Sequence, residues 1–276
     1  MQIAIQGELG SFSHEAAAIL VPQGASLPCA TAEEVLRKLT SSGCDAAVIP
    51  VENSLVGSVV DFYDLFFEYS FAVERELQMR IRHNLIAAPG STLAGVKKVF
   101  SHPVALGQCK RFFAANPHLE AAAFYDTAGS VRHVMAANDP ELAAIASRHA
   151  AAHYGANILR ANIEDREESY TRFWLLRRQG CAAPESAPTK LSVVFSLENR
   201  PGALLQALST FAARKLNLTK IESRPAMKRP WEYLFYADVT IPGHAAADAA
   251  LEELGRICTV VKELGRYRDA EPHPMS

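Results

Sequence analysis

The chain has 276 residues, of which 49% are hydrophobic and 21% charged, and its formal net charge is −2. This length favours two domains, and the composition is that of an ordinary globular protein. The balanced charge gives no electrostatic basis for binding nucleic acid, and no apolar run approaches the roughly 20 residues that span a bilayer. We therefore expect a small-molecule ligand, with no nucleic-acid partner and no membrane.

The N-terminal residues 1–7 lack the basic start and long apolar core of a signal peptide, so they are expected to form a first strand of a cytoplasmic protein. The five cysteines are odd in number and include no Cys-x-x-Cys pair. This spacing argues against a disulfide framework or a zinc site, and reduced thiols are the expectation.

A segment of small, polar and proline residues at 179–188 is predicted to be a linker. Before it, short apolar runs alternate with amphipathic runs, which is the pattern of an α/β domain. Strands are predicted near 3–5, 46–49, 99–100, 122–125, 143–146, 158–159 and 173–176. Helices are predicted near 13–20, 32–41, 59–68, 104–115, 128–138 and 148–154.

The region after the linker has a compact pattern of its own. Strands are predicted at 191–197, 218–224, 232–240 and 259–266, and helices at 202–215 and 245–254. This is the βαββαβ order of a ferredoxin-like α+β sandwich. Because so small a module often pairs through an exposed sheet edge or helix face, a homodimer or homotetramer is expected.

Polar residues gather in the loops that follow the predicted strands, where an open α/β sheet binds its ligands. The loop 6–13 has two glycines, and Ser11 and Ser13 lie at a helix start whose free N–H groups attract anions. Glu52, Asn53 and Ser54 directly follow a buried run. An ordinary capped turn and a solvated loop are the alternative interpretations of these two clusters.

Two further loops contribute polar residues before helices. Ser101 and His102 precede a proline, and the helix that follows carries Gln108. Because adjacent side chains do not face each other, Ser101 and His102 are not a nucleophile and its base. We favour a binding role for His102, with a cap or surface role as the alternative. Thr127 either caps the next helix or contacts a ligand.

The segment Thr171-Arg172-Phe173 opens an apolar run, and it sets a hydroxyl beside a guanidinium. Such a pair suits carboxylate binding and proton donation to a leaving oxygen. Thr-Arg at the start of a buried strand is also common, but the other polar loops favour an active site. No phosphate-binding loop, dinucleotide motif or metal-ligand spacing is present, so no cofactor and no metal are expected.

Taken in order, these motifs resemble the prephenate dehydratase family over nearly the whole chain. The segments are residues 7–13, 50–54, 101–103, 126–128 and 171–173. The second half resembles an ACT regulatory domain in its segments Gly202–Leu205 and Glu222–Pro225.

The resemblance implies a catalytic domain at 1–179 and an ACT domain at 189–268. The catalytic domain would have two lobes like a periplasmic binding protein, about 1–76 with 162–179 and 77–161, with the active site between them. The implied activity is the decarboxylating dehydration of prephenate to phenylpyruvate in phenylalanine biosynthesis, regulated by phenylalanine.

The resemblance also implies roles for individual residues. Thr171 would hydrogen-bond the departing hydroxyl, Arg172 would hold a substrate carboxylate, and Phe173 would complete the motif. The cleft would be lined by Ser11, Ser13, Glu52, Asn53, Ser54, Ser101, His102, Gln108, Thr127 and Ala128. Phenylalanine would bind at a subunit interface through Gly202, Ala203, Leu204, Leu205, Glu222, Ser223, Arg224 and Pro225.

One departure from the family pattern is Val104, where similar enzymes commonly have glutamine after Ser-His-Pro. The stretches 195–198 and 216–225 also look like plant arogenate dehydratases, so arogenate is an alternative substrate. A cytoplasmic two-lobed sensor that binds a small acid without turnover is the rival from another functional class.

Overall fold

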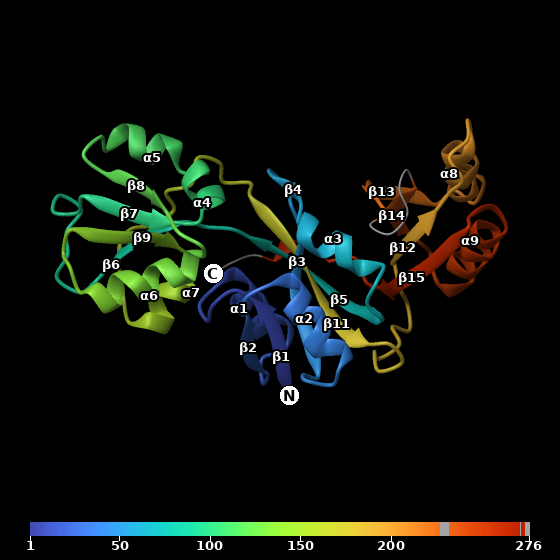
Figure 1. Ribbon diagram of the computed structural model, residues 1–276, viewed down its shortest axis with the longest axis horizontal. Helices are drawn as coiled ribbons and strands as arrows, with labels where there is room; N and C mark the ends of the chain where they lie inside the picture. The colour runs from blue at the N-terminus through green and yellow to red at the C-terminus, as the bar shows by residue number, and fades with distance from the viewer. Residues whose placement is uncertain (227–231, 271, 274–276) are drawn as a thin grey trace.

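Fully buried apolar runs at Ile3–Ile5 and Ala46–Ile49 form the centre of the first sheet in the computed structural model, which describes residues 1–226, 232–270 and 272–273. Three units lie in a row (Figure 1). The first lobe contains β1 (Gln2–Gln6), α1 (Phe12–Leu20), β2 (Ala25–Cys29), α2 (Ala32–Thr40), β3 (Ala46–Asn53), β4 (Gly57–Ser58), α3 (Val60–Phe66), β5 (Phe71–Arg80), β11 (Tyr170–Arg178) and β16 (Pro272–His273). Its sheet order is β16-β5-β11-β3-β1-β2, and β4 pairs with β3.

The second lobe has its own sheet, in the order β10-β6-β9-β7-β8. Its elements are β6 (Asn84–Ala87), β7 (Lys98–Ser101), α4 (Pro103–Gly107), α5 (Lys110–Ala115), β8 (Glu120–Ala123), α6 (Thr127–Ala137), β9 (Leu142–Ala146), α7 (Arg148–Tyr154) and β10 (Asn157–Arg160). The chain enters this lobe after β5 and returns through β11. Because β5 and β11 pair along their whole length, the two crossings lie side by side.

The third unit contains β12 (Lys190–Ser196), α8 (Ala203–Ala213), β13 (Asn217–Pro225), β14 (Tyr233–Thr240), α9 (His244–Ile257) and β15 (Val260–Tyr267). Its sheet order is β13-β14-β12-β15. The βαββαβ order and the arrangement of two α/β lobes are therefore both confirmed.

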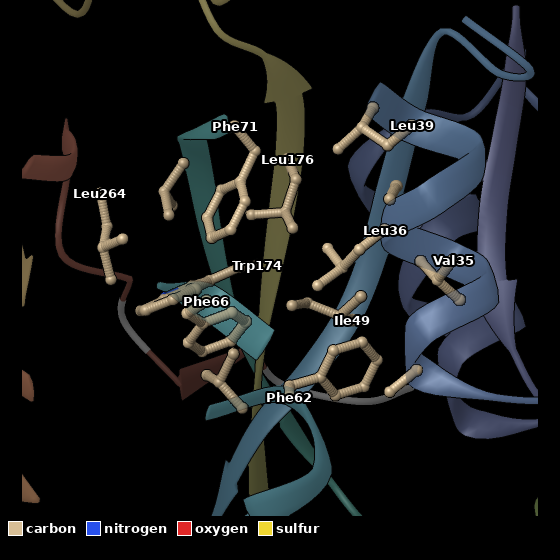
Figure 2. Packing of buried hydrophobic residues seen from close by; sticks show 14 of the residues in the cluster. Val35, Leu36, Leu39, Ile49, Phe62, Phe66, Phe71, Trp174, Leu176 and Leu264 are labelled. Carbon is tan, nitrogen blue, oxygen red and sulfur yellow. The ribbon is translucent and has the colours of Figure 1, made fainter. Parts of the chain in front are cut away.

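The third unit packs its sheet directly onto the first lobe. One face of this sheet is covered by α8 and α9, and the other contributes Leu264 and other side chains to the core of the first lobe. Figure 2 shows Leu264 beside Trp174 and Phe66, whose ring centroids are 5.4 Å apart. This shared core places the third unit against the face of β11 that carries Trp174.

Several elements differ from the sequence expectations. The helix expected at 104–115 is two helices, α4 and α5, which are separated at Gln108 and Cys109. The strand expected at 122–125 begins earlier, at Glu120. Strands β2, β5 and β6 were not predicted, and β5 continues in the first sheet past residue 76. Within the described ranges, no helix is long and apolar enough to span a membrane.

Candidate active site

A cleft of about 610 Å³ lies between the two lobes, at the carboxyl ends of their parallel strands. The loops after β1, β3, β7 and β8 all reach it. Strand β11 runs antiparallel to β3, so its first residues lie beside the last residues of β3. This topology explains why Thr171, at the start of a strand, reaches the same edge as loops that follow strands.

Thr171 and Asn53 face each other across the β11–β3 pair and both line the cleft. Asn53 Nδ2 donates a hydrogen bond to Thr171 Oγ1 over 3.0 Å. The amide is held by its Oδ1, which accepts hydrogen bonds from the backbone N–H groups of Leu55 and Val56. Because the Thr171 oxygen accepts from Asn53, its own proton is available for donation into the cleft.

The floor of the cleft beside Thr171 is apolar. Phe173 is 1% exposed and packs with the core formed by Ile3, Ile5 and Leu175. Phe173 also lines the cleft, because residues 171 and 173 share one face of β11. The hydroxyl of Thr171 therefore projects from the edge of a low-dielectric surface.

Helix N-termini supply the polar rim. Ser11 caps α1 and Asp126 caps α6, each by accepting a hydrogen bond from a backbone N–H group of the first turn. Ser13 and Thr127 lie in these first turns and line the cleft. Among the described residues that line the cleft, none is a lysine or an arginine. Anionic groups would therefore be held by N–H groups and hydroxyls at the positive ends of α1 and α6.

Matches to protein-family models decide the identity of the chain. Residues 3–181 match the family described as prephenate dehydratase, and residues 191–259 match the ACT domain. The chain belongs to the prephenate dehydratase family. It is an enzyme of this family with a C-terminal ACT domain.

Curated relatives are similar over nearly the whole chain. Arogenate dehydratase/prephenate dehydratase 2, chloroplastic, of Arabidopsis thaliana is 36% identical over 277 residues, which cover 97% of this chain and 72% of the relative. The bifunctional chorismate mutase/prephenate dehydratase of Aquifex aeolicus (strain VF5) is 34% identical over 275 residues, covering 98% and 74%.

Two solved structures are similar over almost the whole chain. Prephenate dehydratase from Arthrobacter aurescens, solved in complex with L-Phe, has a TM-score of 0.89 and 31% identity, covering 100% of this chain and 92% of that one. A structure described as GqqA, a novel type of quorum quenching acylases, has a TM-score of 0.88 and 32% identity, covering 97% and 98%.

The cleft brings together eight of the residues that the sequence suggested for the active site. They are Ser11, Ser13, Asn53, His102, Gln108, Thr127, Thr171 and Phe173. Val104, the departure from the family pattern, also lines the cleft.

Arg172 and Glu52 are corrections to the expected site. Because side chains alternate along a strand, Arg172 lies on the opposite face of β11 from Thr171 and points toward the ACT domain. Its guanidinium pairs with Glu52 at 2.7 Å, Glu76 at 2.6 Å and Asp238 at 2.7 Å. Neither Arg172 nor Glu52 lines the cleft, so the expectation that Arg172 holds a substrate carboxylate does not fit the structure.

Three other expected site residues are absent from the lining of the cleft. Ser54 Oγ accepts from the Tyr170 backbone N–H and donates to the Glu168 carbonyl, so it fastens the entry of β11. Ser101 is fully buried and donates to the carbonyl of Ile145. Ala128 packs inside the second lobe. These three residues support the backbone around the cleft through hydrogen bonds or packing.

His83 is a cleft residue that the sequence interpretation missed. Its Nε2 lies 2.8 Å from Gln108 Oε1, and its ring is in edge contact with Phe12. Burial lowers the pKa of His83, while the Gln108 hydrogen bond opposes this shift, so the neutral form of the ring is favoured. The only signal in the sequence was its place just after β5, where the chain crosses between the lobes.

Acidic residues on the cleft rim were also missed. Glu8 of the first lobe accepts a hydrogen bond from Tyr125 at 2.8 Å and pairs with Arg132 at 3.0 Å, both in the second lobe. Burial raises the pKa of Asp126, while backbone N–H groups of Gly129 and Ala128 oppose the shift. The contacts of Glu8 with Tyr125 and Arg132 fix the separation of the lobes on one side of the cleft.

Among the described residues of one chain, the two expected effector segments do not line the same pocket. Gly202 caps α8, and Ala203 and Leu204 line a small cavity of about 130 Å³ with Tyr233. Glu222 and Arg224 face the catalytic domain instead. Glu222 accepts from Ser58 at 2.8 Å, and Arg224 pairs with Asp64 at 2.8 Å.

Proposed function

We propose that the chain converts prephenate to phenylpyruvate, with loss of CO2 and of the ring hydroxyl. The observation that carries this proposal is the Thr171 hydroxyl, held by Asn53 and directed into a cleft between the lobes. Prephenate becomes aromatic as these groups leave, so the enzyme needs only to orient the ring and help hydroxide depart. Thr171 donates a hydrogen bond to the leaving oxygen, and water completes the proton transfer because a threonine hydroxyl is a weak acid.

The carboxylates have different requirements in this mechanism. The side-chain carboxylate is held by N–H groups and hydroxyls at the starts of α1 and α6, where Ser11 and Thr127 lie. The ring carboxylate lies over the apolar surface around Phe173, where little stabilises its charge, so its loss as CO2 is not penalised. In this mechanism Arg172 contacts no substrate.

Arogenate is the second candidate substrate. It carries an ammonium group where prephenate has a keto oxygen. Glu8 and Asp126 line the cleft, and either carboxylate would suit an ammonium group. The relatives named arogenate dehydratase/prephenate dehydratase are consistent with either substrate.

We propose further that phenylalanine regulates the enzyme at an interface between ACT domains of two copies. The Arthrobacter aurescens prephenate dehydratase was solved with L-Phe, which supports this effector. Strand β13 is an edge of the ACT sheet, and Leu205, Ile221 and Tyr233 are 71%, 45% and 43% exposed. An open edge with exposed apolar side chains supports pairing with a second chain. We place the catalytic domain at 1–179 and the ACT domain at 189–268.

The test is to incubate purified protein separately with prephenate and arogenate and to follow phenylpyruvate and phenylalanine. We expect phenylpyruvate from prephenate, and much less of it from Thr171→Ala. The matched control is Thr40→Ala, which removes a hydroxyl bonded only within α2.

The other outcomes each favour a different function. If the protein turned over arogenate alone, it would be an arogenate dehydratase. If it bound either acid without turnover, it would be a small-acid sensor. Hydrolysis of an acylated substrate in the same preparation would indicate the reaction class of the acylase neighbour.

A further inference from the structure

A buried cluster of three cations and three anions joins the ACT domain to the back of the catalytic strand pair. Each domain supplies half of it, and Lys190 also pairs with the more exposed Asp269 at 2.5 Å. The catalytic domain supplies Arg172, Glu52 and Glu76, and the ACT domain supplies Lys190, Lys220 and Asp238.

Arg172 is the centre of the cluster. Its Nη1 donates to Glu52 Oε2 at 2.7 Å, and its Nη2 donates to Glu76 Oε2 at 2.6 Å and to Asp238 Oδ2 at 2.7 Å. Asp238 is 3% exposed, and its second oxygen accepts from Ser192 at 2.6 Å. An ACT-domain carboxylate is therefore fixed on both oxygens and holds the residue next to Thr171.

Lys220 connects the same cluster to the rim of the cleft. Its Nζ donates to Glu52 Oε1 at 2.7 Å and to Ser58 Oγ at 2.7 Å. Ser58 lines the cleft, and Glu52 is adjacent in sequence to Asn53. The ACT domain thus contacts β3 one residue from the side chain that orients the Thr171 hydroxyl.

The charges of the cluster are maintained by one another. Burial alone would raise the pKa of Glu76, but Arg172 and Lys190 hold it below its usual range. Burial likewise acts to raise the pKa of Glu52, and Lys220 and Arg172 lower it. If one partner is neutralised, the opposite charge remains buried without compensation, so the strands must shift or admit water.

We propose that Asp238 and Lys220 of the ACT domain are positioning residues for the Thr171 hydroxyl, because they hold Arg172 and Glu52 on the back face of the β3–β11 pair. Thr171 and Asn53 occupy the front face of the same two strands, directly beside them. A change in how the ACT domain docks therefore displaces the hydroxyl relative to the cleft. The inference rests on the proposed dehydratase function.

The alternative is that these residues only attach one domain to the other, and Lys262 provides the matched control. Its Nζ also crosses from the ACT domain, but it donates to the carbonyls of Phe66, Phe67 and Tyr69 at the end of α3. Lys220→Gln and Lys262→Gln make the same substitution in two interdomain lysines. Only Lys220 reaches the β3–β11 pair.

The first measurement is hydrogen–deuterium exchange of the full-length variants, followed in peptides covering 50–54 and 169–173. We expect exchange at least about fivefold faster in Lys220→Gln and Asp238→Asn, and unchanged exchange in Lys262→Gln. Equal exchange in all three variants and the parent would overturn the proposal. This readout needs no substrate, so it stands even if neither prephenate nor arogenate is turned over.

The second measurement separates positioning from attachment in the active enzyme. Lys220→Gln should lower kcat about tenfold with KM changed less than twofold, because the hydroxyl is misplaced while the binding groups remain. Lys220→Arg, which keeps the charge, should restore most of kcat, and Asp238→Asn replaces Lys220→Gln as the disruptive variant if Lys220→Gln fails to fold. Equal kcat losses in Lys220→Gln and Lys262→Gln would mean that Lys220 only attaches the ACT domain to the catalytic domain, which would overturn the proposal.

Discussion

Asn53 Nδ2 donates to Thr171 Oγ1 across 3.0 Å, and this single hydrogen bond determines which way the Thr171 proton points. The amide oxygen of Asn53 is already bonded to the loop that follows it, so the amide cannot reverse its donor and acceptor without losing those bonds. The orientation of the proton is thus determined by the backbone of residues 53–56.

Removing the Thr171 hydroxyl should abolish most turnover. Thr171→Ala is expected to lower kcat by about 10²–10³-fold, because the leaving oxygen loses its hydrogen-bond donor. Thr171→Ser should keep part of the activity. The measurement is the steady-state kinetics of phenylpyruvate formation, and near-normal kcat in folded Thr171→Ala would reject the assigned role.

Reversing the hydrogen bond between Asn53 and Thr171 should also lower the activity. Asn53→Asp has nearly the same shape, but its carboxylate accepts from Thr171 and withdraws the proton from the cleft. We expect kcat to fall by about 10–100-fold. Asn157→Asp, in β10 away from the cleft, is the control for the added charge. Equal kcat in the two variants would show that the proton direction is unimportant.

Arg172 should be needed for stability. Arg172→Gln leaves Asp238 buried without its cation and leaves Glu76 with Lys190 alone, at a cost of about 3–5 kcal/mol in the free energy of unfolding. Arg256→Gln removes ion pairs with Glu252 and Glu253, in which the arginine side chain is 64% exposed, and it should cost less than about 1 kcal/mol. Urea unfolding measures both. Equal losses of unfolding free energy in the two variants would contradict a structural role for the buried cluster around Arg172.

A histidine contact between the lobes makes stability depend on acid pH. His14 Nδ1 in α1 lies 3.0 Å from His149 Nε2 in α7. Burial, with His149 and His153 nearby, lowers the pKa of His14 to about 4. The unfolded chain, with a histidine pKa near 6.5, binds the proton more readily, so this stabilisation is complete above about pH 6.5.

We expect the melting temperature to fall as the pH decreases from about 6.5 to 4, because the unfolded chain binds a proton at His14 that the folded chain does not. His14→Gln should reduce this dependence, and His118→Gln, which replaces a histidine of the second lobe that contacts Leu93, should not. Thermal unfolding across this pH range is the measurement. Identical pH profiles for His14→Gln and the parent would exclude the contact as the cause.

Two glycines with the same backbone conformation distinguish a close contact between the lobes from backbone strain. Gly7 has φ +92° and Gly90 has φ +91°. Alanine at either position should cost roughly 1–2 kcal/mol through the left-handed conformation. Only at Gly7 would the added Cβ meet a neighbour, Asp126 Oδ2, at 2.7 Å. Gly7→Ala should therefore also raise KM, and equal KM values in the two variants would contradict this.

The periodic elements were largely predictable because their signals are local. The buried runs at 3–5 and 46–49 read as strands, and the segments after residue 189 gave the βαββαβ order correctly. The strand β5 was missed because Arg75 breaks the alternation of its apolar residues, with Glu74 and Glu76 on either side of it. Glu76 is compensated by Arg172 and Lys190, which are distant in sequence.

The sequence by itself determined most of the elements, the order of domains and the loops that bear polar residues, since strand ends and helix starts are local features. Only the tertiary structure decided which face of β11 meets the cleft. Alternation separates Thr171 from Arg172, but nothing local states which of them faces the substrate and which faces the ACT domain. That choice depends on long-range packing, which buries Trp174 and Phe66 against Leu264 and turns Arg172 toward Asp238.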